Sequence, residues 1–274
     1  MRTKERGNRT LPGPAVLTER SARVVAAVKL HRQVARRRVR RFLAEGPNLV
    51  EAAIVSGLVR DVFVTEVAAQ RHATVLATLK CPVHPVSERA AKALSDTVTP
   101  TGLIAVCEMP TTRLATVLAG SPQLVVAAVE ISEPGNAGTV IRIADAMGAA
   151  AVIFGGYTVD PYNGKCLRSS AGSIFSITVV VASDAYAAVT ELRAAGLQVL
   201  ATMVDGETSL DEAKPLLGKP TAWLFGSEPH GLSTEIAEAA DYRVRIPMVG
   251  GVESLNVAAT AAICLYQSSR ALRL

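Results

Sequence analysis

Residues 124–142 read LVVAAVEISEPGNAGTVIR and place a wholly apolar strand directly before a turn and an amphipathic helix. Five further apolar strands follow at residues 150–154, 174–181, 198–203, 222–225 and 242–246, and helical patterns lie between them at 137–147, 185–195 and 255–267. Strands that are apolar on both faces and alternate with helices are typical of a parallel sheet covered on both sides. We therefore expect residues 123–274 to form one α/β domain around a parallel sheet.

The preceding part of the chain has shorter elements. Helices are expected at 18–30, with Thr18 as the N-cap, and at 49–56, 66–79 and 88–94, and strands at 41–45, 59–65, 83–86 and 102–107. This alternation predicts a small α/β domain over residues 18–107. Residues 108–122 have the composition of a linker, and residues 1–17, which carry Gly7, Pro12, Gly13 and Pro14, of a flexible basic tail.

Composition narrows the classes of protein. The chain has 274 residues and is 49% hydrophobic but only 4% aromatic, so it can form a large core from Ala, Val, Leu and Ile. Its four cysteines lie far apart and show no zinc-binding spacing, so we expect reduced thiols and no metal site. No apolar run reaches the roughly 20 residues that cross a bilayer. Since no secretory signal is visible either, we expect a cytoplasmic protein without a membrane segment.

The charge is concentrated at one end of the chain. Residues 1–41 hold 13 of the 29 Lys and Arg residues but only two of the 24 acidic residues. The densest block includes Arg36, Arg37 and Arg38, which can neutralise phosphates and give salt-sensitive binding to nucleic acid. A solvated surface or an anionic membrane are the alternatives. Arg168 is a secondary candidate for an RNA contact.

Three loops follow strands of the expected parallel sheet, where ligands bind in such folds. In the first, Asn136 is expected to cap the helix 137–147, and Arg142 is either functional or a surface residue paired with Asp145. In the second, Gly226 allows close approach to the backbone, and Glu228 is either a helix-start carboxylate or a site acid.

In the third loop, Ser254 is expected to cap the helix 255–267, so that Asn256 lies in its first turn. Asparagine is a poor helix former there, which indicates either a functional role or a second capping group. The chain contains neither the glycine fingerprint of dinucleotide-binding enzymes nor a P-loop, which disfavours both of those classes.

Together and in this order, EPGNAGTVIR (133–142), FGSEPHGLS (225–233) and IPMVGGVESLNVA (246–258) resemble the three motifs of the SpoU (TrmH-like) RNA 2′-O-ribose methyltransferases of the SPOUT superfamily. DPYNGKCLRSSAGS (160–173) resembles the segment between the first two motifs, and RFLAEGPNLVEAAI (41–54) resembles the start of a ribosomal-protein-like RNA-binding domain. Within the family, the chain is most similar to the 23S rRNA methyltransferases of the thiostrepton-resistance type.

The resemblance implies a catalytic domain with a trefoil knot, a homodimer formed through that domain, and S-adenosylmethionine as the cofactor. The implied cofactor-binding residues are Leu224, Phe225, Gly226, Ile246, Met248 and Leu255, and the implied catalytic residues are Asn136, Arg142, Glu228, Ser254 and Asn256. Methyl transfer of this kind requires no metal.

The expected activity is methylation of a ribose 2′-hydroxyl, with 23S rRNA as the expected substrate because of the N-terminal domain. A tRNA substrate and a non-catalytic RNA- or ribosome-binding protein are the alternatives. Arginine holds its proton too tightly to be a simple base. We therefore expect Arg142 to bind a phosphate and to stabilise the developing alkoxide.

Overall fold

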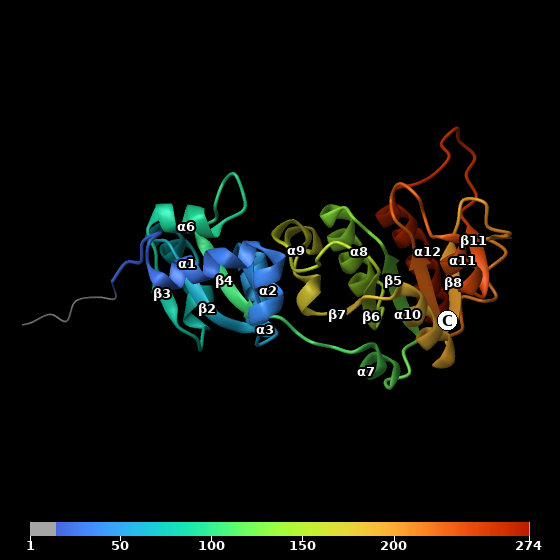
Figure 1. Ribbon diagram of the computed structural model, residues 1–274, viewed down its shortest axis with the longest axis horizontal. Helices are drawn as coiled ribbons and strands as arrows, with labels where there is room; N and C mark the ends of the chain where they lie inside the picture. The colour runs from blue at the N-terminus through green and yellow to red at the C-terminus, as the bar shows by residue number, and fades with distance from the viewer. Residues whose placement is uncertain (1–14, 274) are drawn as a thin grey trace, which may run out of the picture.

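The computed structural model describes residues 15–273, so most of the expected basic tail lies outside the described residues. Two sheets lie end to end along the long axis of the molecule (Figure 1). The N-terminal sheet has four strands and the C-terminal sheet has seven. Helix α7 (Leu114–Leu118) lies in the connection between them, inside the expected linker.

The N-terminal sheet has the strand order β1-β4-β2-β3 and mixed pairing. Strand β4 pairs antiparallel with β1 and β2, whereas β2 and β3 are parallel. The strands are β1 (Arg41–Glu45), β2 (Val59–Val64), β3 (Val83–Pro85) and β4 (Leu103–Glu108). The helices of this part are α1 (Ala22–Val28), η1 (Lys29–His31, a 3-10 helix), α2 (Gln33–Val39), α3 (Pro47–Val55), α4 (Glu66–Arg71), α5 (Ala73–Ala77) and α6 (Glu88–Leu94).

The start of the described chain differs from the prediction. The expected helix 18–30 is shorter, because Ser21 and not Thr18 precedes α1. Leu17, expected in the flexible tail, forms a parallel bridge with Val86. The basic helix α2 was not expected, since its run of arginines has no continuous apolar face, and it ends where Arg40 adopts φ 55°. The expected helix 66–79 is interrupted at His72.

The C-terminal sheet confirms the predicted parallel sheet. Its strand order is β7-β6-β5-β10-β8-β11-β9, and each neighbouring pair is parallel. The strands are β5 (Leu124–Val129), β6 (Ala151–Gly155), β7 (Thr178–Ala182), β8 (Gln198–Thr202), β9 (Thr208–Ser209), β10 (Thr221–Phe225) and β11 (Tyr242–Arg245). The helices are α8 (Pro134–Ala146), α9 (Gly164–Ser170), η2 (Ser173–Phe175), α10 (Ala185–Ala194), α11 (Thr234–Ala239) and α12 (Val257–Leu272).

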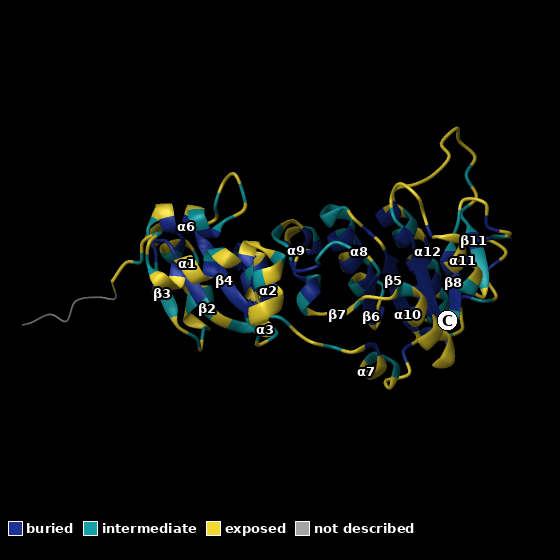
Figure 2. Ribbon diagram, in the orientation of Figure 1, coloured by how far each residue is buried: buried dark blue, intermediate teal, exposed yellow. Residues whose placement is uncertain are grey.

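Helices cover both faces of this sheet, as the apolar strands predicted. In β5, Leu124, Val126 and Ala128 pack in one core with residues of α8 and α12. Val125, Ala127 and Val129 of the same strand pack in a second core with residues of α10 and α11. Alternating side chains of a strand point to opposite faces, so β5 is buried on both. The central strands are accordingly dark in Figure 2.

Residues 15–273 contain neither a membrane-spanning helix nor a cluster of metal-binding side chains. No helix there is long and apolar enough to cross a membrane. No group of three or more His, Cys, Asp or Glu side chains in that range could hold a metal ion. The four cysteines are unpaired.

Candidate active site

The loops after β5 and β10 meet at one edge of the parallel sheet. The two strands are neighbours, with Ala128 opposite Phe225 in the register. Parallel strands end at the same edge, so the residues that follow them are brought together. At this edge the first and second sequence motifs come into contact.

The Glu228 carboxylate is the centre of this contact. Its Oε2 accepts hydrogen bonds from the backbone N–H and the hydroxyl of Ser132, both at 3.2 Å. Its Oε1 accepts from the backbone N–H of Glu133 at 3.2 Å and from Nδ2 of Asn136 at 3.0 Å. Glu228 therefore fixes the turn that leads into α8.

Asn136 joins the third motif to this cluster. Its Oδ1 accepts a hydrogen bond from Nδ2 of Asn256 at 3.0 Å. An ionised carboxylate can only accept hydrogen bonds, so the Asn136 amide must turn its NH₂ toward Glu228 and its oxygen toward Asn256. Glu228, Asn136 and Asn256 thus form one oriented chain of hydrogen bonds.

The same contacts set the charge state of the cluster. Partial burial by itself raises the pKa of the Glu228 carboxyl, but hydrogen bonds from Asn136 and from backbone N–H groups outweigh it and hold the pKa below its usual range. Glu133 also has a lowered pKa, because Lys165 and the Gly135 N–H donate hydrogen bonds to it. Both groups are therefore anionic at neutral pH.

The helix caps differ from those expected. Helix α8 begins at Pro134 and its N-cap is Glu133, whose side chain accepts from the Gly135 N–H, so Asn136 is free to bind Glu228 and Asn256. Helix α12 begins at Val257, and its N-cap is Asn256 rather than Ser254. The Asn256 Oδ1 accepts from the Ala258 N–H at 2.9 Å. Asn256 therefore caps α12 and also belongs to the cluster, and its catalytic role stays a prediction.

Two expected catalytic residues are not in the hydrogen-bonded chain. Ser254 is exposed in the segment before α12. Arg142 is exposed on α8, one turn beyond Gly138, whose face packs on α9. Within the described part of the chain Arg142 has no ion pair, with Asp145 or with another carboxylate. Its guanidinium is available to a ligand.

Comparison with known proteins identifies the family of this chain. Residues 123–266 match the SpoU rRNA Methylase family, and residues 22–105 match the MRM3-like substrate binding domain. The chain belongs to the SpoU rRNA methylase family. It is 38% identical over 240 residues to the 23S rRNA (guanosine(2553)-2′-O)-methyltransferase RlmP of Bacillus subtilis (strain 168), which covers 87% of this chain and 92% of that relative.

Other relatives are also similar to this chain, in sequence and in structure. The 23S rRNA (uridine(2479)-2′-O)-methyltransferase of Streptomyces viridochromogenes is 36% identical over 174 residues, 62% of this chain and 61% of that protein. The crystal structure of the SpoU methyltransferase AviRb from the same organism, in complex with AdoMet, superposes with a TM-score of 0.79 at 30% identity and covers 91% of this chain and 98% of that one. An AdoMet-bound rRNA methyltransferase from Sinorhizobium meliloti has a TM-score of 0.79 at 30% identity and covers 93% and 98%.

The loops predicted to hold the cofactor follow β10 and β11. Leu224 and Phe225 are fully buried, so their side chains belong to the core around the sheet. A Cβ on Gly226 would lie 2.2 Å from the carbonyl carbon of Gly231, which shows that this glycine is required by its own loop. Ile246 and Met248 are half-buried and Leu255 is 37% exposed. Backbone groups with an apolar lining suit a nucleoside that carries an adenine, so the residues fit the predicted cofactor.

The structure also identifies site residues that the sequence did not. Ser132 and Glu133 shape the turn, and Lys165 Nζ lies 2.6 Å from Glu133 Oε1. Gly138 allows α9 to pack closely on α8, since a Cβ there would lie 2.3 Å from the Cys166 carbonyl oxygen. Lys165 lies inside the segment 160–173, so the resemblance to the family already marked its neighbourhood.

The four predicted RNA contacts have different environments. Arg37 and Arg38 are exposed on α2. The prediction that Arg36 contacts RNA is wrong, because its side chain is only 6% exposed and is ion-paired with Asp160. A buried and paired guanidinium is not available to a phosphate. Arg168 is exposed and ion-paired with Asp96.

Proposed function

We propose that this protein transfers a methyl group from S-adenosylmethionine to a ribose 2′-hydroxyl of 23S rRNA. Membership of the SpoU family supports the reaction, and the relatives named above support the cofactor and the substrate class. The chain of hydrogen bonds from Glu228 through Asn136 to Asn256 is the observation on which the proposal rests, because it joins all three motifs at one edge of the sheet.

The cofactor supplies an activated methyl group on a sulfonium sulfur. The residues after β10 and β11 would hold its nucleoside through backbone groups, with Gly226, Ile246, Met248 and Leu255 as the lining. Apolar side chains exclude water from the sulfonium, and the positive charge that disappears during the transfer is then not stabilised by solvent. No acidic side chain of the cluster is required as a metal ligand.

Arg142 would act on the RNA. A guanidinium stays protonated at neutral pH, so it would bind the phosphate next to the target ribose and stabilise negative charge as the hydroxyl oxygen attacks. Asn136, fixed by Glu228 and Asn256, would position the ribose. Ser254 lies within the third motif and would contribute from the segment before α12.

The assembly is also part of the proposal. We propose a homodimer through the catalytic domain and a trefoil knot in its C-terminal part. Apolar side chains near the third motif are exposed, namely Val249, Val252, Leu255, Ile263 and Tyr266, which supports a partner surface there. Membership of the SpoU family supports the knot. An rRNA substrate is consistent with the predicted cytoplasmic location.

Ribose methylation can be mapped across all rRNAs and tRNAs in cells with and without this protein. We expect one 23S rRNA position to lose its 2′-O-methyl group without the protein. The purified protein should then restore methylation on unmodified 23S rRNA with labelled S-adenosylmethionine. Loss of a tRNA methyl group instead would replace the substrate, and no change in any RNA would contradict the function.

A further inference from the structure

We propose that Arg36 is a positioning residue, which with Asp160 and helix α9 fixes the basic helix α2 relative to the methyl-transfer site. This inference rests on the proposed function, since it concerns how RNA is presented to that site. Arg36 would fix the position of the helix, whereas its neighbours Arg37 and Arg38, which are exposed on the same helix, would contact the RNA.

Arg36 connects three segments of the chain. Its Nε and Nη2 donate to Oδ2 of Asp160 at 2.9 and 2.5 Å. Its Nη1 donates to the carbonyl oxygens of Leu30 and His31, both at 2.9 Å. Asp160 in turn accepts from the Tyr162 N–H through its other oxygen, at 3.0 Å. The guanidinium therefore joins η1 and α2 of the N-terminal part to the loop between β6 and α9.

The burial of this pair restricts its geometry. The side chains of Arg36 and Asp160 are 6% and 10% exposed. A buried charge that loses its partner is strongly disfavoured, so the two groups cannot separate freely. A planar guanidinium that donates in two directions also fixes orientation, which a single point charge does not. The pair thus sets an angle between the two parts of the molecule.

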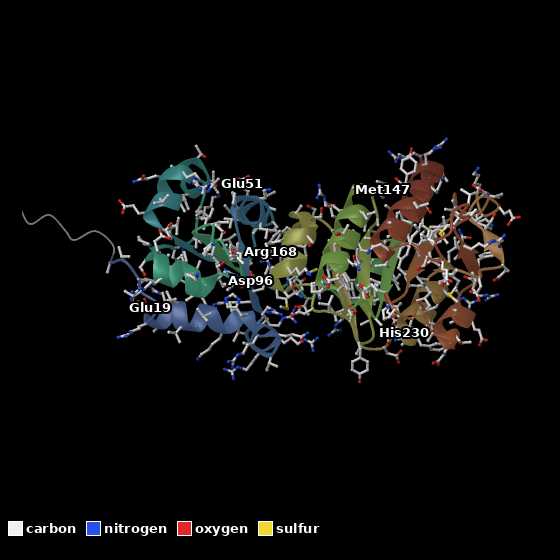
Figure 3. The ribbon with its side chains drawn as sticks, turned by 90° about the horizontal axis from the view of Figure 1, so that it is seen from above. Glu19, Glu51, Asp96, Met147, Arg168 and His230 are labelled. Carbon is white, nitrogen blue, oxygen red and sulfur yellow. The ribbon has the colours of Figure 1, made fainter. Side chains whose placement is uncertain are left out.

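A second ion pair of opposite polarity lies at the same junction. Here the N-terminal part supplies the carboxylate, Asp96, and the catalytic domain supplies the arginine, Arg168 (Figure 3). Asp96 also packs so closely on the first residue of α9 that a Cβ on Gly164 would overlap its carboxylate. Two pairs with reversed charges match in only one relative orientation, because turning the parts would bring like charges together.

Apolar contacts complete the junction. The ring of Phe42 in β1 lies 4.9 Å from that of Tyr162 and 5.9 Å from that of Phe175, measured between centroids. Phe42 and Tyr162 belong to one buried cluster that continues from the N-terminal sheet into the catalytic domain, and Phe175 packs against it. The N-terminal domain is therefore docked on α9 and η2 as part of a common core, and Figure 1 shows α9 between it and α8.

Helix α9 connects this junction to the candidate active site. Lys165, in its first turn, is ion-paired with Glu133, the N-cap of α8. Gly138 brings the backbone of α9 against α8 close to Arg142. RNA held by the exposed arginines of α2 would therefore meet a catalytic helix at a fixed position.

The test compares two adjacent arginines on two RNA substrates. Arg36→Gln and Arg37→Gln are assayed on a long 23S rRNA fragment and on a short stem-loop that carries only the mapped target. Because a misplacement of about 1 Å can lower a rate about 100-fold, we expect Arg36→Gln to lower kcat/KM on the long fragment by roughly 10- to 100-fold. On the short stem-loop, which does not reach α2, it should match the wild type.

Salt dependence separates positioning from contact. Arg37→Gln should reduce the slope of log K against log salt by about 0.9 for each phosphate contact that is lost. Arg36→Gln should leave this slope unchanged. Asp160→Asn removes the charge of the partner on the other side of the junction. It should have the same activity on the two RNAs and the same salt slope as Arg36→Gln. The affinity for the cofactor should be normal in all three variants.

Small-angle scattering provides a readout that does not depend on activity. Arg36→Gln and Asp160→Asn should give scattering profiles that differ from that of the wild type, whereas Arg37→Gln should match it, because the angle between the two docked parts is then less strictly fixed. Equal losses on both RNAs, a reduced salt slope in Arg36→Gln, no effect of Asp160→Asn, or unchanged scattering would each overturn the proposal. If the wild type methylates no RNA, the proposed function is wrong. If the wild type methylates RNA and the Arg36 and Asp160 variants have the same activity as the wild type, only the inference is wrong.

Discussion

The side chains of Asn136 and Asn256 share a hydrogen bond of 3.0 Å, although 120 residues separate them in the sequence. The bond links the first turn of α8 to the N-cap of α12. Because Asn136 also donates to Glu228, the loop after β10 is joined to the starts of both helices. Side-chain hydrogen bonds therefore join the three motifs directly.

The two functions of Asn256 can be separated by substitution. Asn256→Ala removes both the cap and the bond to Asn136, and a lost N-cap costs about 1 kcal/mol of stability. Asn256→Ser keeps a capping oxygen but has no amide to donate to Asn136, so unfolding in urea should show nearly wild-type stability. Both variants should lower kcat/KM by roughly 2- to 10-fold, the equivalent of one hydrogen bond. Full activity in Asn256→Ser would show that the bond to Asn136 has no catalytic role.

Arg142 should be required for chemistry and not for folding. Because loss of one group that stabilises developing negative charge lowers kcat by about 100- to 1,000-fold, Arg142→Ala should lose most methyl transfer in single-turnover assays. Its circular dichroism and its affinity for S-adenosylmethionine should be unchanged. Arg142→Lys keeps the charge but not the planar fork and should be intermediate. Near-normal turnover in Arg142→Ala would contradict the assignment.

Glu228 should stabilise the fold in a pH-dependent way. Its pKa is lowered in the folded state, so its contribution is complete above the unfolded-state pKa of about 4.3 and is lost as the pH falls through the lower folded-state value. The carboxylate is exposed, so this contribution is at most about 1 kcal/mol. The difference in unfolding free energy between wild type and Glu228→Gln should be constant from pH 7 to about pH 5 and shrink at lower pH. Glu51→Gln, at an exposed position on α3, is the control. A difference that grows on acidification would refute the sign of the shift.

Gly138 should tolerate no side chain. A Cβ there would lie 2.3 Å from the Cys166 carbonyl oxygen and 2.6 Å from the Ser169 Cβ. Overpacking of this kind costs about 1 to 3 kcal/mol, so Gly138→Ala should lower the melting temperature and weaken the contact between α8 and α9. Gly218→Ala is the matched control, since nothing lies within 4 Å of the added atom. Equal melting temperatures for the two variants would show that the close approach is not needed.

Several elements could be predicted because the information is local. The run 124–129 is apolar throughout and forms β5 with those bounds. Helix α6 likewise occupies the predicted residues 88–94. Caps were less predictable. Ser254 and Asn256 are both good capping residues, and only the packing of α12 decides that Asn256 is used.

The sequence by itself determined the parallel sheet, the covering helices and the order of the three motifs, because periodicity and turn residues act over a few positions along the chain. Only the tertiary structure decided that Arg36 is buried against Asp160 while Arg37, the next residue, is exposed. Both residues have the same chemistry and lie in the same basic run. Their environments differ because a helix turns them to different sides and because a loop more than 100 residues later supplies a carboxylate on one side only.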